Sequence, residues 1–160
     1  MVIIYASDDK VKEKEDCMFN PADWGLIPDG HDIAKELEKA LKENDSVTLA
    51  KGEYMTSPLD IPSGSHLILE EGAVLKFISD FSIYEPVFTR WEGVKCYCMH
   101  PCVYIDNAKD VIIEGQGIID GSGQAWWDEA LKKKGKVFEP TSEIEKKFAA
   151  LNPDYKSQPG

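Results

Sequence analysis

The sequence contains 160 residues, 42% of them hydrophobic and 29% charged, and its formal net charge is −11 at pH 7. These proportions are typical of a soluble globular domain with a sizeable core. The negative charge argues against nucleic acid and against an anionic membrane as partners, because either would need a concentrated basic surface. An acidic substrate is not excluded, since a cleft can be basic locally.

Residues 1–21 are predicted to form a polar lead-in without a signal peptide, because they contain no basic region followed by an apolar core. No later stretch approaches the roughly 18 consecutive apolar residues of a membrane-spanning helix. A cytoplasmic location is therefore expected. The four cysteines, Cys17, Cys96, Cys98 and Cys102, do not resemble a disulfide framework in a chain of this length, which favours reduced thiols.

The first regular element expected is an amphipathic helix over residues 31–44. Asp29-Gly30 is a strong turn signal before it, and Asp32 is placed to cap its N-terminus. A helix ahead of a set of strands is suited to cover their open end, where unpaired backbone would otherwise promote aggregation. The apolar face of this helix consists of Ile33, Leu37, Ala40 and Leu41.

Residues 46–119 contain short β-branched runs, each closed by a turn-forming Asp, Asn or Gly, and this pattern predicts strands. The runs repeat, because shifting the sequence against itself superimposes three copies that start near Val47, Leu67 and Val111. The shifts align Tyr54-Met55 with Val74-Leu75, Leu67-Ile68-Leu69 with Val111-Ile112-Ile113, and Val74-Leu75 with Ile118-Ile119.

A repeat of about 20 residues made of strands and turns cannot bury its apolar side alone and must stack on its neighbours. Because the asparagine or cysteine ladder of leucine-rich repeats is missing, the pattern favours a parallel β-helix. Two interpretations of the long interval before the third copy stay open. It contains either one coil plus an excursion over residues 79–101, where binding residues often lie, or two coils of which one is degenerate.

Residues 128–160 differ from the repeats. Two short charged helices are expected over residues 128–136 and 143–151, and no capping unit of a solenoid is recognisable after them. We therefore expect the chain to be the front part of a longer protein, with residues 22–127 forming its first coils.

Short motifs rich in Gly, Trp and aliphatic residues follow one another along the chain. They are Trp24-Gly25, Asp29-Gly30, 47–54 (VTLAKGEY), Ser57-Pro58-Leu59, 67–73 (LILEEGA) and 118–127 (IIDGSGQAWW). In this order they resemble the N-terminal third of the family 28 glycoside hydrolases, which include polygalacturonases, exopolygalacturonases and rhamnogalacturonases. The resemblance covers about residues 22–128. It implies an all-β fold, the right-handed parallel β-helix of the pectate-lyase-like superfamily, here with an N-terminal capping helix.

The resemblance also implies hydrolysis of α-1,4-galacturonosyl linkages of pectin with inversion, by two carboxyl groups about 6.5–9.5 Å apart. The family's catalytic motifs are Asn-Thr-Asp, Asp-Asp, Gly-His-Gly and Arg-Ile-Lys, and none occurs within or after the matched region. No catalytic residue is assigned, and the chain alone is expected to be inactive. The implied partner is a galacturonate-containing polysaccharide or oligosaccharide. A second chain that carries the remaining coils is a partner only under the half-enzyme alternative.

Two alternatives stay open. One is a half-enzyme that the second chain completes. The other is a non-catalytic β-helix module that binds an acidic glycan or has a structural role.

Three residues are candidates for substrate binding. Arg90, the only arginine, lies in the expected excursion, and its planar guanidinium is suited to bind a galacturonate carboxylate through two parallel hydrogen bonds. The simpler alternative is an ion pair with Glu92 or another contact that fastens the loop. Trp126 and Trp127 are candidates for a sugar-stacking platform. Since neighbouring residues of a strand face opposite ways, only one of them is expected to stack there.

The segment Cys96-x-Cys98-x-His100-x-Cys102 contains residue types that bind zinc. Its spacing differs from the usual C-x₂-C arrangement. Alternation along an extended chain would also place all four side chains on one side, which is a poor tetrahedral cage. Cysteines that act as small apolar residues are favoured, so no metal and no other cofactor is expected.

Overall fold

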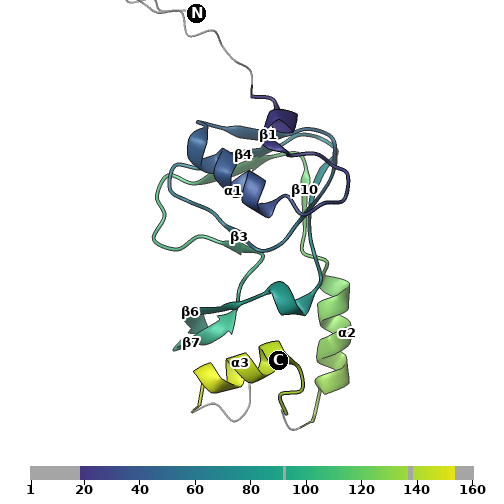
Figure 1. The fold of residues 1–160 in the computed structure, drawn as a ribbon, viewed down its shortest axis with the longest axis vertical. Coiled ribbons are helices and arrows are strands. Elements are labelled where there is room, and N and C mark those ends of the chain that lie inside the picture. Colours follow the sequence, from purple (N-terminus) through teal and green to yellow (C-terminus); the bar gives the residue numbers. More distant parts are fainter. Residues whose placement is uncertain (1–18, 92, 137–138, 154–160) are drawn as a thin grey trace, which may run out of the picture.

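The computed structural model describes residues 19–91, 93–136 and 139–153. Short strands and one helix form the upper half of the molecule, and a hairpin and two further helices form the lower half (Figure 1). No helix among these residues is long and apolar enough to cross a membrane. The elements are η1 (Pro21–Trp24), α1 (Ala34–Glu43), β1 (Val47–Leu49), β2 (Gly52–Thr56), β3 (Leu59–Asp60), β4 (His66–Leu69), β5 (Ala73–Phe77), η2 (Phe81–Ile83), β6 (Pro86–Trp91), β7 (Val94–Met99), β8 (Val103–Tyr104), β9 (Ile112–Gly115), β10 (Ile118–Asp120), α2 (Gly123–Lys133) and α3 (Glu143–Leu151).

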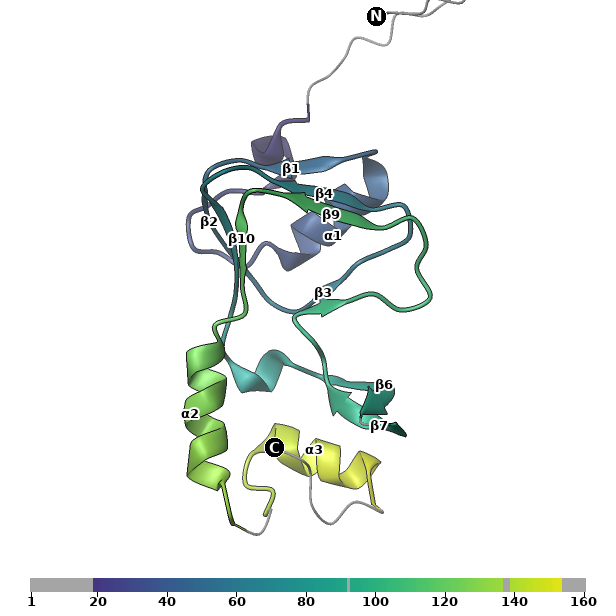
Figure 2. The same cartoon turned by 180° about the vertical axis from the view of Figure 1, so that it is seen from behind.

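The repeats stack as parallel strands, as predicted. We call β1–β2 turn one, β3–β5 turn two and β8–β10 turn three. Strand β4 lies between β1 and β9, β5 lies between β2 and β10, and β3 pairs with β8, so each sheet collects one strand from successive turns (Figure 2). Because turn two pairs directly with turn three, residues 79–101 are an excursion between them and no degenerate coil intervenes.

The pairing of β2 with β5 differs from the prediction. Tyr54 lies opposite Leu75 rather than opposite Val74. The cause is the corner before β5, from Leu69 to Ala73, which is one residue longer than the corner before β2. A shift by one residue exchanges the two faces of a strand, and the observed register puts the aromatic ring of Tyr54 inside, next to Leu75.

The pairing of β9 also differs, with Ile113 rather than Val111 opposite Leu67. A tight corner after β9 accompanies this shift. Gly115 has a φ of +120°, and a Cβ atom there would lie 2.0 Å from the carbonyl oxygen of Leu69, so only glycine fits. The two amides that follow donate to the same oxygen at 2.9 and 3.0 Å. Because the shift is an even number of residues, the inward-facing side chains stay inward.

Helix α1 begins later than predicted, at Ala34, and the predicted cap Asp32 precedes the N-cap residue Ile33. The Asp32 Oδ1 atom accepts hydrogen bonds from the amide of Ala34 at 3.0 Å and from the amide of Ser57 at 2.9 Å. Asp32 therefore joins the start of the helix to the turn that follows β2, instead of acting as a local cap alone.

The core lies between the sheets and α1. Side chains at equivalent positions of successive turns form ladders, and in one of them the exposed fraction is 3% for Tyr54, 1% for Leu75 and 46% for Ile119. Ile119 is exposed because, among the described residues, no strand pairs with the outer edge of β10. The helix contributes its predicted apolar face to this core, namely Ile33, Leu37, Ala40 and Leu41.

The excursion is an ordered antiparallel hairpin of β6 and β7, preceded by η2. Helix α3 and the residue that follows it contact the outer edge of this hairpin. The backbone N–H and C=O groups of Tyr97 bond to the side chain of Asn152 at 2.9 and 3.0 Å, and Lys147 forms an ion pair with Glu85. These contacts fix the hairpin relative to the C-terminal helix although the two are far apart in sequence.

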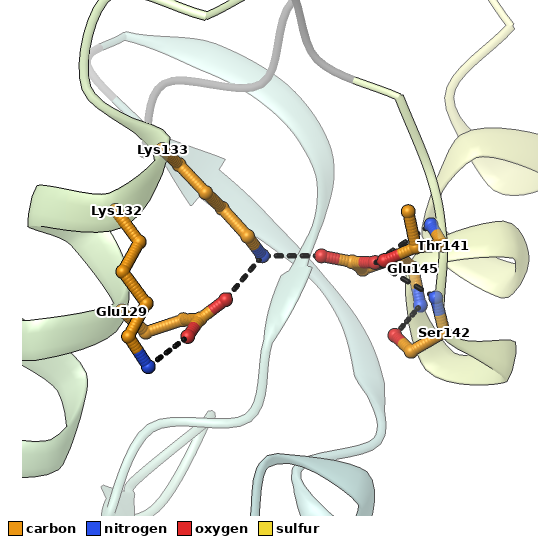
Figure 3. A network of polar contacts seen from close by, with 6 residues as sticks. All are labelled: Glu129, Lys132, Lys133, Thr141, Ser142 and Glu145. Atoms are coloured by element: carbon orange, nitrogen blue, oxygen red, sulfur yellow. Dashed lines mark hydrogen bonds and ion pairs between the residues drawn. The ribbon is translucent and has the colours of Figure 1, made fainter.

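Helix α3 has the predicted bounds, whereas α2 begins at Gly123 rather than at residue 128. A polar network joins them (Figure 3). Lys133 of α2 pairs with Glu145 of α3, and Glu145 also accepts hydrogen bonds from the amides of Thr141 and Ser142, both at 2.9 Å. Burial would raise the pKa of Glu145, but Lys133 and these amides outweigh it and hold the pKa well below its usual range.

We expect Glu145→Gln to destabilise the fold by roughly 2 kcal/mol near neutral pH, because it removes charge-assisted contacts. Glutamate in the unfolded chain has a pKa of about 4.3, so the unfolded chain takes up the proton before the folded one does. The stabilisation is therefore complete above that pH and is lost as the pH falls below it. Thermal unfolding of both proteins over this range should show the difference shrinking in acid. A difference that does not change with pH would contradict this account.

Candidate functional site

The two candidate tryptophans lie on helix α2, not on a strand as predicted. The Trp126 ring packs edge-on against Phe81 and Tyr84, with ring centroids 4.4 and 4.7 Å away. Trp127 points elsewhere, with 63% of its surface exposed. The structure thus gives Trp126 a packing role and leaves Trp127 in solvent. Only the strand placement was wrong, because a helix starts at Gly123 and turns neighbouring residues by about 100° instead of 180°. Sugar stacking by either tryptophan stays a prediction.

Arg90 lies near the end of β6 with its side chain exposed. Its Nε–H donates to the carbonyl oxygen of Gly93 at 3.1 Å, across the hairpin turn. This is a loop-fastening contact of the kind expected as the simpler alternative, made to backbone rather than to an acid. The proposed partner Glu92 lies outside the described residues. Figures 1 and 2 place the hairpin and α2 on opposite sides of the lower half, so Arg90 is not brought to the tryptophans.

One face of the hairpin gathers residues that the sequence analysis did not connect with Arg90. Phe88 pairs with Tyr97, and Arg90 pairs with Lys95 across the two strands. Side chains directly opposite each other, and those two residues apart on one strand, share a face. Phe88, Arg90 and Lys95 are exposed, whereas Val87 and other residues of the opposite face in the body of the hairpin are half-buried. The alternation within the excursion could have indicated this face, had antiparallel pairing been expected there.

The four zinc-type residues are not gathered into a cage. Cys96 and Cys98 are neighbours on β7 with sulfur atoms 3.4 Å apart, whereas His100 and Cys102 follow after the strand has ended at Met99. Burial raises the pKa of the Cys98 thiol to about 11. Among the residues that the structure describes, no three His, Cys, Asp or Glu side chains lie together as a metal site.

Two shallow depressions of about 280 and 330 Å³ lie on the surface, and neither includes the predicted site residues. The larger one contains two carboxylates, Asp60 and Asp106, together with Lys42 and Tyr104. Nearby, His100 Nε2 lies 3.4 Å from Asp60 Oδ1. This depression is open to solvent. It therefore lacks the apolar, water-poor surroundings that raise the pKa of the catalytic acid in glycosidases such as lysozyme.

The packing of α2 predicts different results for the two tryptophans. Trp126→Ala should destabilise the fold by about 3 kcal/mol, because it empties the space between Phe81 and Tyr84. Trp127→Ala should change the free energy of unfolding by less than about 0.5 kcal/mol, as expected for an exposed position. Urea unfolding of both variants provides the measurement. Equal effects would mean that Trp126 does not hold α2 on the excursion.

Comparisons with solved structures find similar folds among glycoside hydrolases. No protein-family model matches the sequence. The structure is similar to a hyperthermoactive exopolygalacturonase from Thermotoga maritima, with a TM-score of 0.62 and 27% identity over 84% of this chain and 32% of that protein. It is also similar to a protein assigned as a glycosyl hydrolase from Parabacteroides merdae ATCC 43184, with a TM-score of 0.54 and 22% identity over 80% of this chain and 55% of that protein.

A third similar structure is a family 28 exopolygalacturonase from Yersinia enterocolitica, with a TM-score of 0.52 and 20% identity over 62% of this chain and 20% of that protein. At these identities the second and third comparisons concern the fold alone. The chain spans about a third of the length of the Thermotoga enzyme. Together with the parallel stack, the comparisons show that the fold of this chain is similar to that of these glycoside hydrolases, two of which are exopolygalacturonases.

Proposed function

We propose that this chain forms the first coils of a pectin-directed glycoside hydrolase of the inverting, galacturonosyl-cleaving type. The observation that carries the proposal is the parallel stack of turns one to three, in a chain whose structure is similar to part of the Thermotoga exopolygalacturonase at 27% identity. The substrate would be a galacturonate-containing polysaccharide or oligosaccharide. The catalytic carboxyl pair would be supplied by coils outside the described residues. The cytoplasmic location expected from the sequence stays a prediction.

Within this proposal the strands wind as a right-handed β-helix, and α1 covers the end formed by turn one. The support is local: the apolar side of α1 is buried in the same core as Val47, Leu49 and Leu59, and the Glu38 carboxylate accepts a hydrogen bond from the Asp60 amide at 2.8 Å. The helix would prevent the edge of the first strands from pairing with other molecules.

Turn three would carry the next coil. Ile119 occupies the inward position of its ladder yet is 46% exposed. Burying apolar surface of this kind yields about 25 cal/mol per Å², and a parallel strand on β10 would also satisfy its free backbone groups. Further coils, from the same polypeptide or from a second chain, would meet both needs.

The coding DNA beyond the codon for Gly160 provides the first test. We expect a frame, continuous or adjacent, that encodes further repeats with Asn-Thr-Asp and Asp-Asp motifs. The product of that frame, assembled with this chain, should release reducing ends from polygalacturonate, whereas the 160-residue chain alone should not. Hydrolysis by this chain alone would contradict the proposal. An assembly that retains polygalacturonate without cleaving it would support the non-catalytic, glycan-binding alternative.

The open face of turn three also predicts self-association of the purified chain. Sedimentation velocity should show a concentration-dependent shift toward larger species. Ile119→Lys should abolish that shift by placing a charge on the exposed strand, whereas Ile27→Lys, at an exposed isoleucine near η1, should leave it unchanged. Circular dichroism of both variants controls for folding. A monomer at all concentrations would argue against an adhesive edge at β10.

A further inference from the structure

The exposed face of the β6–β7 hairpin carries two cations opposite each other. Arg90 pairs with Lys95 in the register of the two strands, close to the hairpin turn. Side chains directly opposite in an antiparallel pair have Cβ atoms about 5 Å apart, and like charges there destabilise the hairpin. The chain has a net charge of −11, so cations are in the minority and opposite charges were available for this position. An anionic group bound between Arg90 and Lys95 would offset the repulsion between them, which points to a negatively charged partner.

An aromatic pair adjoins these cations on the same face. The rings of Phe88 and Tyr97 have centroids 5.2 Å apart and are tilted by 56°. Phe88 is 57% exposed, which is unusual for a large aromatic side chain in an ordered strand. The exposed part of the Phe88 ring offers apolar surface next to the two cations. The ligand therefore needs an apolar face next to its negative charge.

The guanidinium of Arg90 keeps donors available for such a ligand. Its Nε–H is used by the carbonyl oxygen of Gly93 at 3.1 Å, and this bond fixes the plane of the group. A guanidinium has four further N–H donors on its two Nη atoms, which are arranged to bind both oxygens of one carboxylate. The backbone of β7 is itself held by Asn152 of the segment after α3, so the face is built on a rigid support.

We propose that this face, formed by Phe88, Arg90, Lys95 and Tyr97, binds a uronate sugar of an acidic oligosaccharide. The carboxylate accepts hydrogen bonds from Arg90 and Lys95 and relieves their repulsion, while the C–H face of the sugar ring lies on Phe88 or Tyr97. The choice of a uronate rests on the proposed function. Nucleic acid is a poorer candidate, because its denser negative charge would be repelled more strongly by a molecule with a net charge of −11.

Binding of trigalacturonate to the purified chain tests this inference, with its fully methyl-esterified form as the uncharged probe. Titration followed by amide NMR should shift the signals of β6 and β7, and the ester should bind at least about tenfold more weakly. Arg90→Gln and Lys95→Gln should each weaken binding about tenfold, and Phe88→Ala should weaken it several-fold. Lys95→Gln should leave thermal stability unchanged or raise it, which separates loss of binding from loss of structure.

Two matched controls belong to the experiment. Lys35→Gln removes the same charge from α1, and Trp91→Ala removes an exposed aromatic ring from the opposite face of β6. Both should bind trigalacturonate within about twofold of the unaltered chain. Equal weakening by Lys35→Gln, or signal changes outside the hairpin only, would overturn the inference, and so would equal binding of the ester.

The outcome is independent of the test of the proposed function. If the assembled product cleaves polygalacturonate but the hairpin variants bind and cleave normally, the hydrolase assignment stands and the hairpin site is wrong. If the hairpin binds trigalacturonate and no hydrolase activity is found, the site stands and the chain is a glycan-binding module.

Discussion

Each turn of this chain depends on the next one to bury its inward-facing side chains. Tyr54 and Leu75 are almost completely buried because another turn lies on each of them, whereas Ile119, at the equivalent position of turn three, is largely exposed. A single turn has too few apolar contacts to compensate for the conformational entropy lost on ordering it. Stability therefore accumulates along the stack, and the two ends of the stack are the parts that need another partner. At the first end α1 contributes its apolar face to the core.

The excursion between turns two and three adds a surface to the fold without interrupting the pairing of the stacked strands. Strands β3 and β8 pair across it, so the parallel sheets continue as if residues 79–101 were absent. The excursion is instead stabilised by the C-terminal helices: Trp126 of α2 packs on η2, and Asn152 closes the edge of β7. This separate support fixes the strands on whose exposed face Arg90 and Lys95 lie opposite each other.

Much of the architecture was predictable because it depends on local periodicity. Short β-branched runs closed by turn residues identified the strands, and the repeat identified their stacking. The exact register was not predictable at the corners. The extra residue in the β4–β5 corner shifts the pairing of β2 with β5, and the tight corner at Gly115 accompanies the shift in the pairing of β9. The conformation of such a corner depends on close backbone contacts, such as the approach of Gly115 to the carbonyl oxygen of Leu69. The site was less predictable still, because Lys95 and Tyr97 become neighbours of Arg90 and Phe88 only through antiparallel pairing within the excursion.

The sequence by itself determined the parallel stack of turns, the apolar face of α1, the bounds of α3 and the resemblance to family 28 glycoside hydrolases, because each depends on residues close together in the chain or on a repeated pattern. The tertiary structure alone decided that Trp126 packs inward from a helix, that α2 and α3 are joined through Lys133 and Glu145, and that two cations meet on one hairpin face. These features arise from contacts between segments whose spacing in the sequence carries no periodic signal, so they become visible only when the chain is folded.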